Sequence, residues 1–134
     1  MAVSLRKKVT LTDTFEVSSG KIVTEHRCVK IVTGGLVENS AASTTSLLGV
    51  ALEDGVAGDK VLIQLEGIAT IAASDSAVNA GEYLISDADG KVDTLPSADG
   101  DHFIIGKALA DAEAEDDLIP VHLLAQVDNS NDAA

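Results

Sequence analysis

The 134-residue sequence has very few aromatic side chains: one Tyr, two Phe and no Trp, 2% of the residues. The core must therefore be built from Val, Ile, Leu and Ala, which suit pleated strands. The single cysteine, Cys28, permits neither an internal disulfide nor a Cys-x-x-Cys metal site. No apolar run approaches the roughly 20 residues that span a bilayer, and the start lacks the apolar stretch of a signal peptide. We expect one domain, made in a reducing cytoplasm, with no membrane contact.

Basic side chains are scarce as well. Nine Lys and Arg stand against 22 Asp and Glu, which gives a formal net charge of −13. Affinity for nucleic acid comes mainly from Lys and Arg contacts with phosphates. The composition therefore excludes direct nucleic-acid binding as the main function.

The charge is distributed unevenly along the chain. Residues 1–30 hold six basic and three acidic residues (net +3), whereas the remainder holds three Lys and 19 acids (net −16). A basic segment on an acidic body predicts an extended N-terminal arm, residues 1–20, that grips a partner. The alternative is a solvated tail, since chain termini are often poorly ordered. Residues 126–134 are polar and are expected to form a C-terminal tail.

The predicted secondary structure is almost entirely β. Short apolar runs rich in β-branched residues alternate with Gly-Gly, Asp-Gly and Gly-Asp turn signals, which supply the positive φ of tight turns. In residues 61–66, Val61, Ile63 and Leu65 fall on one face and Gln64 and Glu66 on the other. The two Ala-containing segments that could be helical, residues 40–46 and 108–115, do not show an apolar stripe with a 3.6-residue period. We predict strands at residues 28–33, 47–52, 60–65, 68–72, 82–86, 103–109 and 118–124.

An internal repeat organises these strands. Leu47-Leu-Gly-Val-Ala-Leu-Glu-Asp54 recurs further along the chain as Ile104-Ile-Gly-Lys-Ala-Leu-Ala-Asp111, and residues 29–37 loosely match residues 84–92. Two such units folded on each other could close a small barrel and remove free strand edges. The predicted fold is therefore an all-β, small β-barrel or β-tulip-like domain over residues 21–125. It is built from two similar halves, with little helix.

Residues that could carry chemistry are few and scattered. His26, His102 and His122 do not have zinc-motif spacing, and no nucleophile-elbow or phosphate-loop motif is present. Residues 87–93 resemble a calcium loop, but Ile85 and Pro96 would occupy its first and last ligand positions, so an Asp-Gly hairpin turn explains the motif better. The acidic cluster of residues 111–117 is interpreted as a solvated turn, and Cys28 as a buried, inert thiol. We predict no catalytic residue, cofactor or metal.

The residues leave two functional classes open. The chain could be a stand-alone β-barrel carrier or ligand-binding module, for which Lys60 is the only plausible modified lysine. It could also be a small enzyme assembled at an oligomer interface from His26, His102 and the acidic turns.

Residues 28–124 carry an ordered series of motifs that resembles the capsid decoration (cement) proteins of tailed bacteriophages and, more remotely, lambda-type head decoration proteins. The series comprises Leu48-Gly-Val-Ala-Leu-Glu53, Gly58-Asp-Lys-Val-Leu-Ile-Gln64, Glu66-Gly-Ile-Ala69, Ala80-Gly-Glu-Tyr-Leu84, Asp89-Gly-Lys-Val92, Ile105-Gly-Lys-Ala-Leu109 and Asp117-Leu-Ile-Pro-Val-His-Leu123. Residues 1–20 match no motif of these proteins.

This resemblance implies a structural virion protein, commonly a homotrimer, on the exterior of an expanded phage head. It would be made in the bacterial cytoplasm and would bridge neighbouring subunits of the major capsid protein. The N-terminal arm could add a strand to a capsid sheet edge. Its apolar side chains would then enter pockets and its cations would face acidic capsid groups: Val3, Leu5, Arg6, Lys8, Val9 and Leu11.

Overall fold

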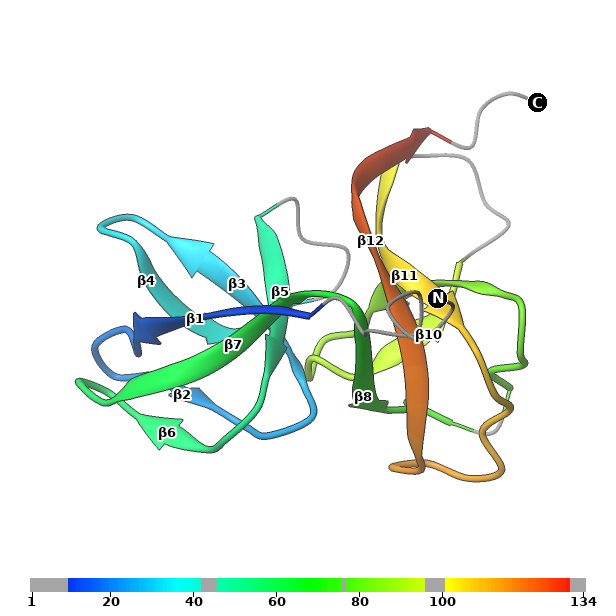
Figure 1. The fold of residues 1–134 in the computed structure, drawn as a ribbon, viewed down its shortest axis with the longest axis horizontal. Coiled ribbons are helices and arrows are strands. Elements are labelled where there is room, and N and C mark those ends of the chain that lie inside the picture. The colour runs from blue at the N-terminus through cyan, green and yellow to red at the C-terminus, as the bar shows by residue number, and fades with distance from the viewer. Residues whose placement is uncertain (1–9, 42–45, 76, 96–100, 131–134) are drawn as a thin grey trace, which may run out of the picture.

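A computed structural model describes residues 10–41, 46–75, 77–95 and 101–130 (Figure 1). Its described residues contain strands and turns and no helix, which confirms the all-β prediction. None of these elements is therefore a helix that could cross a membrane. The strands are β1 Leu11–Glu16, β2 Ile22–Val23, β3 Cys28–Val32, β4 Leu36–Asn39, β5 Leu47–Ala51, β6 Gly55–Val56, β7 Lys60–Glu66, β8 Ile68–Ala72, β9 Tyr83–Ser86, β10 Val92–Thr94, β11 Asp101–Ala108 and β12 Leu118–Ser130.

The strands form two five-stranded sheets that lie side by side in Figure 1. The first half of the molecule has the order β1-β7-β5-β3-β4, and the second has β8-β12-β11-β9-β10. A third, two-stranded sheet pairs β2 with β6 in the first half. Each strand of the first large sheet thus has a counterpart at the same place in the second.

Strand register shows that the halves are repeats of one unit. Residues Thr12–Phe15 pair with β7 in the same register as residues 69–72 pair with β12, and this pairing keeps the chain offset of the repeated motif. The hairpins β3–β4 and β9–β10 also share one register. The predicted two similar halves are therefore confirmed in the pairing of the backbone.

The small all-β domain built from two halves is as predicted, and only the expected closure of the two halves into one barrel differs. In the part of the chain that the structure describes, each large sheet curls until its ends meet at one isolated parallel bridge: Val17 with Val37, and Ala73 with Val92. The halves do not pair edge to edge into a common barrel. They stack, joined by backbone bonds such as Cys28 N–H to the Gly90 carbonyl (2.7 Å) and Ala72 N–H to the His26 carbonyl (2.9 Å).

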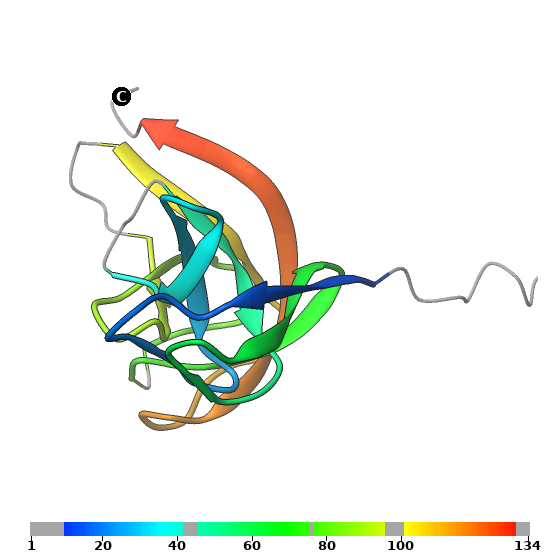
Figure 2. The same cartoon turned by 90° about the vertical axis from the view of Figure 1, so that its left-hand side faces the viewer.

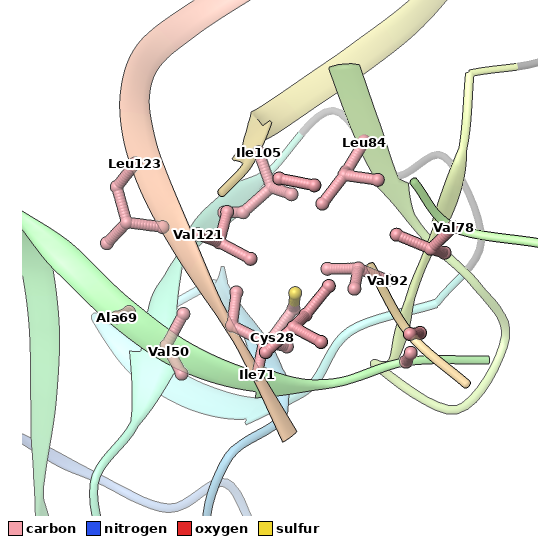
Figure 3. Packing of buried hydrophobic residues seen from close by; sticks show 14 of the residues in the cluster. Cys28, Val50, Ala69, Ile71, Val78, Leu84, Val92, Ile105, Val121 and Leu123 are labelled. Atoms are coloured by element: carbon pink, nitrogen blue, oxygen red, sulfur yellow. The ribbon is translucent and has the colours of Figure 1, made fainter. Parts of the chain in front are cut away.

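The buried apolar residues that the structure describes form two clusters, one for each half. The smaller lies inside the first sheet and comprises Val17, Val23, Val29, Val37, Ala51, Val61 and Ile63. The larger lies inside the second sheet, yet Cys28, Leu47 and Val50 of the first half belong to it. Figure 3 shows Cys28 and Val50 beside Ile71 and Val121. The outer face of the first sheet therefore covers the core of the second.

This stacking changes the expected faces of β7. Val61 and Ile63 are buried as predicted, but Gln64, expected on the solvent side, is also buried. Its Nε2 donates to the carbonyls of Glu66 (3.1 Å) and Ile68 (3.0 Å). Gln64 thus stabilises the passage from β7 to β8, where the chain crosses from one sheet to the other at Gly67 (φ 101°).

Candidate functional site

The predicted contact arm is only partly within the described residues. Val3, Leu5, Arg6, Lys8 and Val9 lie outside them. Leu11, the last residue of the predicted set, begins β1 opposite Glu66 of β7, and its side chain is exposed. Residues 11–16 of the segment expected as an arm are a strand of the first sheet.

Among the described residues, strand β1 is an edge of that sheet: it pairs with β7, and Val17, just after it, forms the single bridge to β4. Its residues are almost all exposed, and β7 is its neighbour on one side (Figure 2). An edge strand presents backbone N–H and C=O groups to which another chain can add a strand. Such an edge can bind a partner through the main chain, while alternate side chains provide specificity.

A groove between the halves lies next to the start of β1. It has a volume of about 550 Å³, and half of its lining residues are leucines, among them Leu48, Leu65 and Leu124. Glu66 and His122 contribute its polar side chains. Because Leu11 pairs with Glu66, the chain enters β1 at the rim of this groove. With its mixed apolar and polar lining, this groove is a candidate binding surface.

The three histidines occupy different places and roles. The Nδ1 atom of His26 lies 3.1 Å from the Thr70 carbonyl in the second half. This carbonyl accepts a hydrogen bond when Nδ1 carries the ring proton, and the contact joins the two halves. His102 lies on β11, and His122 is exposed on β12. Among the described residues no three His, Cys, Asp or Glu side chains form a group that could hold a metal ion.

The calcium-like segment is a hairpin turn, as predicted. Asp87 Oδ1 accepts hydrogen bonds from the backbone N–H groups of Asp89 (2.8 Å) and Lys91 (2.9 Å), and Gly90 has φ 83°. The carboxylate therefore shapes the β9–β10 turn, which leaves it a structural rather than a ligand role.

The acidic cluster at residues 111–117 is more than a solvated turn. Lys91 Nζ lies 2.8 Å from Asp116 and 3.0 Å from Glu115, and the lysine side chain is only 8% exposed. These hydrogen bonds raise the pKa of Lys91, and the lysine lowers the pKa of Asp116. Sequence spacing missed this ion pair because its partners lie far apart in the chain and meet only in the folded second half.

Cys28 is fully buried, as the sequence predicted. Burial, with a smaller contribution from the Asp87 charge, raises the pKa of its thiol to about 12. The thiolate, which is the reactive form, is therefore nearly absent at neutral pH. Lys60, the lysine considered for a carrier, is the exposed first residue of β7, opposite Glu16 of β1.

Comparison with known proteins identifies the family. The family model described as phage cement protein matches residues 6–123 of the sequence. The chain belongs to the phage cement protein family. This membership supports a structural role in a phage capsid and favours a non-enzymatic protein over the enzyme considered above.

A solved structure has a fold similar to that of this chain. The crystal structure of the head fiber gp8.5 N base of bacteriophage phi29 is 18% identical, with a TM-score of 0.66. The alignment covers 89% of this chain and 98% of that one. At this identity the likeness concerns the fold alone. No curated protein sequence matches the chain.

Proposed function

We propose that this chain is a capsid decoration protein that binds the outer surface of the expanded phage head. There it stabilises contacts between neighbouring subunits of the major capsid protein. The observation that carries this proposal is the cement-family match over residues 6–123. The exposed edge strand β1 and the leucine-lined groove beside it are surfaces through which such a protein can bind.

The proposed mechanism is preferential binding to the assembled shell. A ligand that binds only the assembled lattice stabilises it by mass action. A homotrimer would engage several capsid subunits at once, so modest contacts would add up through effective concentration. Synthesis takes place in the bacterial cytoplasm, and the mature location is the capsid exterior.

The N-terminal segment is the proposed capsid contact. It carries alternating apolar and basic residues (Val3, Leu5, Arg6, Lys8, Val9) and leads into the exposed Leu11 of the edge strand β1. Strand addition at a capsid sheet edge would order this segment, and its cations would face acidic groups of the capsid.

Co-sedimentation with expanded, undecorated heads tests the proposal. We expect saturable binding of the full chain at a fixed number of copies per capsomer, and light scattering of the free protein to give a trimer. Deleting residues 2–10 leaves β1 intact and should lower the affinity at least about tenfold. The matched charge variant Arg6→Glu/Lys8→Glu should lose affinity, and Ser4→Ala should keep it. Absence of saturable binding by the full chain would refute the decoration role.

A further inference from the structure

The groove between the halves lies where the N-terminal segment joins the fold. Glu66 lines this groove and is the register partner of Leu11, the first residue of β1. Figure 1 shows the start of β1 beside the passage from β7 to β8, between the two halves. Thr10 alone separates Leu11 from residues 3–9. These residues are therefore tethered to the rim of the groove.

The groove offers apolar surface that the described residues leave partly open. Leu48, Leu65 and Leu124 line it, and each is only half-buried. Leu48 and Leu65 pack against the apolar cluster of the first half, and Phe15 of β1 packs against the same cluster. An apolar segment laid over these leucines would remove their remaining surface from water, which is favourable.

The sequence before β1 continues the alternation of that strand. Because alternate residues of a strand share a face, Leu11 lies on the face of Phe15, which is the face turned to the first cluster. The preceding odd-numbered residues are apolar with one exception, and the even-numbered ones are polar: Val3, Leu5, Lys7 and Val9 against Ser4, Arg6, Lys8 and Thr10. The apolar set thus continues the face of β1 that borders the groove leucines.

We propose that residues 3–9 of the same chain occupy this groove in the free protein, with their apolar side chains on its leucines. Their cations, Arg6, Lys7 and Lys8, then meet Glu66 at the rim and an acidic body, because residues 31–134 carry a net charge of −16. The inference does not depend on the decoration role. If the segment adds to a capsid sheet edge, it leaves the groove to do so.

A second copy of the chain is a poorer source of this segment. A tether of one residue gives the chain's own segment an effective concentration in the millimolar range. A segment from another copy lacks this advantage, and its arrival would bring two acidic bodies together.

The apolar hollow beside Ile22 and Val56 is a poorer site for the segment. Asp59 lines that hollow, and its carbonyl accepts the N–H of Val17, just after the end of β1. The hollow therefore lies at the opposite end of β1, and the six residues of this strand span about 20 Å. The segment would have to run back along the whole strand to reach it.

Disulfide formation between introduced cysteines tests the site directly. The native thiol of Cys28 is buried and does not compete. Leu5→Cys/Leu124→Cys pairs the segment with the groove, and Leu5→Cys/Val56→Cys is the matched control at the opposite end of β1. We expect the first pair to oxidise within one chain at least about tenfold faster than the control, as measured on denaturing gels. Accessibility favours the control, because Val56 is the more exposed position.

Methyl NMR of the free protein gives a second readout without added thiols. Deleting residues 2–10, or the double change Leu5→Ser/Val9→Ser, should shift the methyl signals of the groove leucines and leave that of Val56 in place. Ser4→Ala should shift neither.

Three outcomes would overturn the inference. Unchanged leucine signals, or a control pair that oxidises as fast as the groove pair, would show that the segment does not occupy the groove. Disulfide-linked dimers from the groove pair would show that the segment comes from a second copy. None of these measurements uses capsids, so their failure is distinguishable from a failure of the decoration role.

Discussion

At the scale of single residues, comparison of the two halves shows which turn positions require a positive φ. It also shows where one half carries a side chain at such a position and the other half carries glycine. His26 (φ 68°) and Gly81 (φ 90°) are equivalent, since their N–H groups bond to the carbonyls of Ala51 and Ala108, which hold the same place in the repeated motif. Only glycine adopts positive φ freely, so a side chain there costs about 1–2 kcal/mol. His26 offsets this cost by bonding Thr70 across the halves.

Asp116 and Gly58 form the second such pair. Gly58 (φ 89°) donates to the Val17 carbonyl, and Asp116 (φ 72°) donates to that of Ala73. Here the non-glycine residue holds Lys91. In each case the fold requires a positive φ at one turn position of both halves. One half has glycine there, and the other has a side chain that bonds to a neighbouring segment.

The Lys91 ion pair gives a prediction for pH dependence. Because the folded pKa of Asp116 lies below its ordinary value of 3.8, its contribution to stability is present above that value and is lost as the pH falls further. The pKa of Lys91 lies above its ordinary value of 10.5. The contribution of the charged lysine to stability is therefore present below pH 10.5 and is lost as the pH rises through the folded pKa. Lys91→Met should therefore lower the melting temperature at pH 7, with the difference from the parent shrinking well below pH 3.8.

Asp116→Asn is the matched variant, because Asn also tolerates positive φ. It should cost less than Lys91→Met, since Glu115 still pairs with the lysine. Melting curves from pH 2 to 9 measure both effects. A Lys91→Met curve that runs parallel to the parent curve at all pH values would contradict the assigned role.

The thiol of Cys28 gives a second residue-scale prediction. With a pKa of about 12 and a fully buried sulfur, it should not react with a disulfide reagent at pH 8 in the folded protein. It should react within minutes in denaturant, where its pKa returns to the ordinary range. Absorbance of the released thiolate reports both rates. Rapid labelling without denaturant would place Cys28 at the surface.

At the scale of elements, the strictest steric constraint lies at two strand positions, where the backbone of a neighbouring strand leaves no room for a Cβ atom. A Cβ atom at Gly49 of β5 would collide with the Gln64 carbonyl of β7. A Cβ atom at Gly106 of β11 would collide with the His122 carbonyl of β12. The two glycines hold the same position in the two copies of the repeated motif, so the unit itself requires glycine where its central strand packs on the next one.

Substitutions of these glycines should therefore be severe in both halves. Gly49→Ala and Gly106→Ala should each destabilise the protein by more than about 3 kcal/mol, because backbone atoms cannot move aside cheaply. Gly35→Ala in the β3–β4 turn has open space around its added Cβ and should cost about 1–2 kcal/mol from its positive φ alone. Urea unfolding of the three variants measures the difference, and equal losses would contradict the packing explanation.

At the scale of the whole molecule, the halves are stacked head to tail. Cys28 and Val50 on the outer face of the first sheet lie in the second half's core. Their counterparts, Tyr83 and Lys107, face outward, with the ammonium group 5.3 Å from the ring centroid. A polar outer face on the terminal unit of a repeat prevents further stacking. The second half therefore caps the pair.

Because the first half completes the second half's core, we predict that the two unfold together. Val50→Ala should destabilise the protein by about 2 kcal/mol through the cavity that it leaves at this junction. Native-state hydrogen exchange should show the slowest amides of β7 and β12 shifting by the same free energy. A loss of amide protection confined to the second half would indicate that the two halves unfold independently.

The strands with strong apolar periodicity, the duplication and the inert cysteine were predictable from the sequence, because these depend on local pattern. Five short or polar strands were not predicted from the sequence: β1, β2, β4, β6 and β10. Strand β1, Leu11–Glu16, has too little apolar alternation to be recognised, since almost all of it faces solvent. The burial of Gln64, the pairing of Lys91 with Asp116 and the meeting of Ile22 with Val56 on the surface depend on how distant segments come together in the fold. A strand's periodicity separates its two faces, whereas what covers each face depends on how the halves stack.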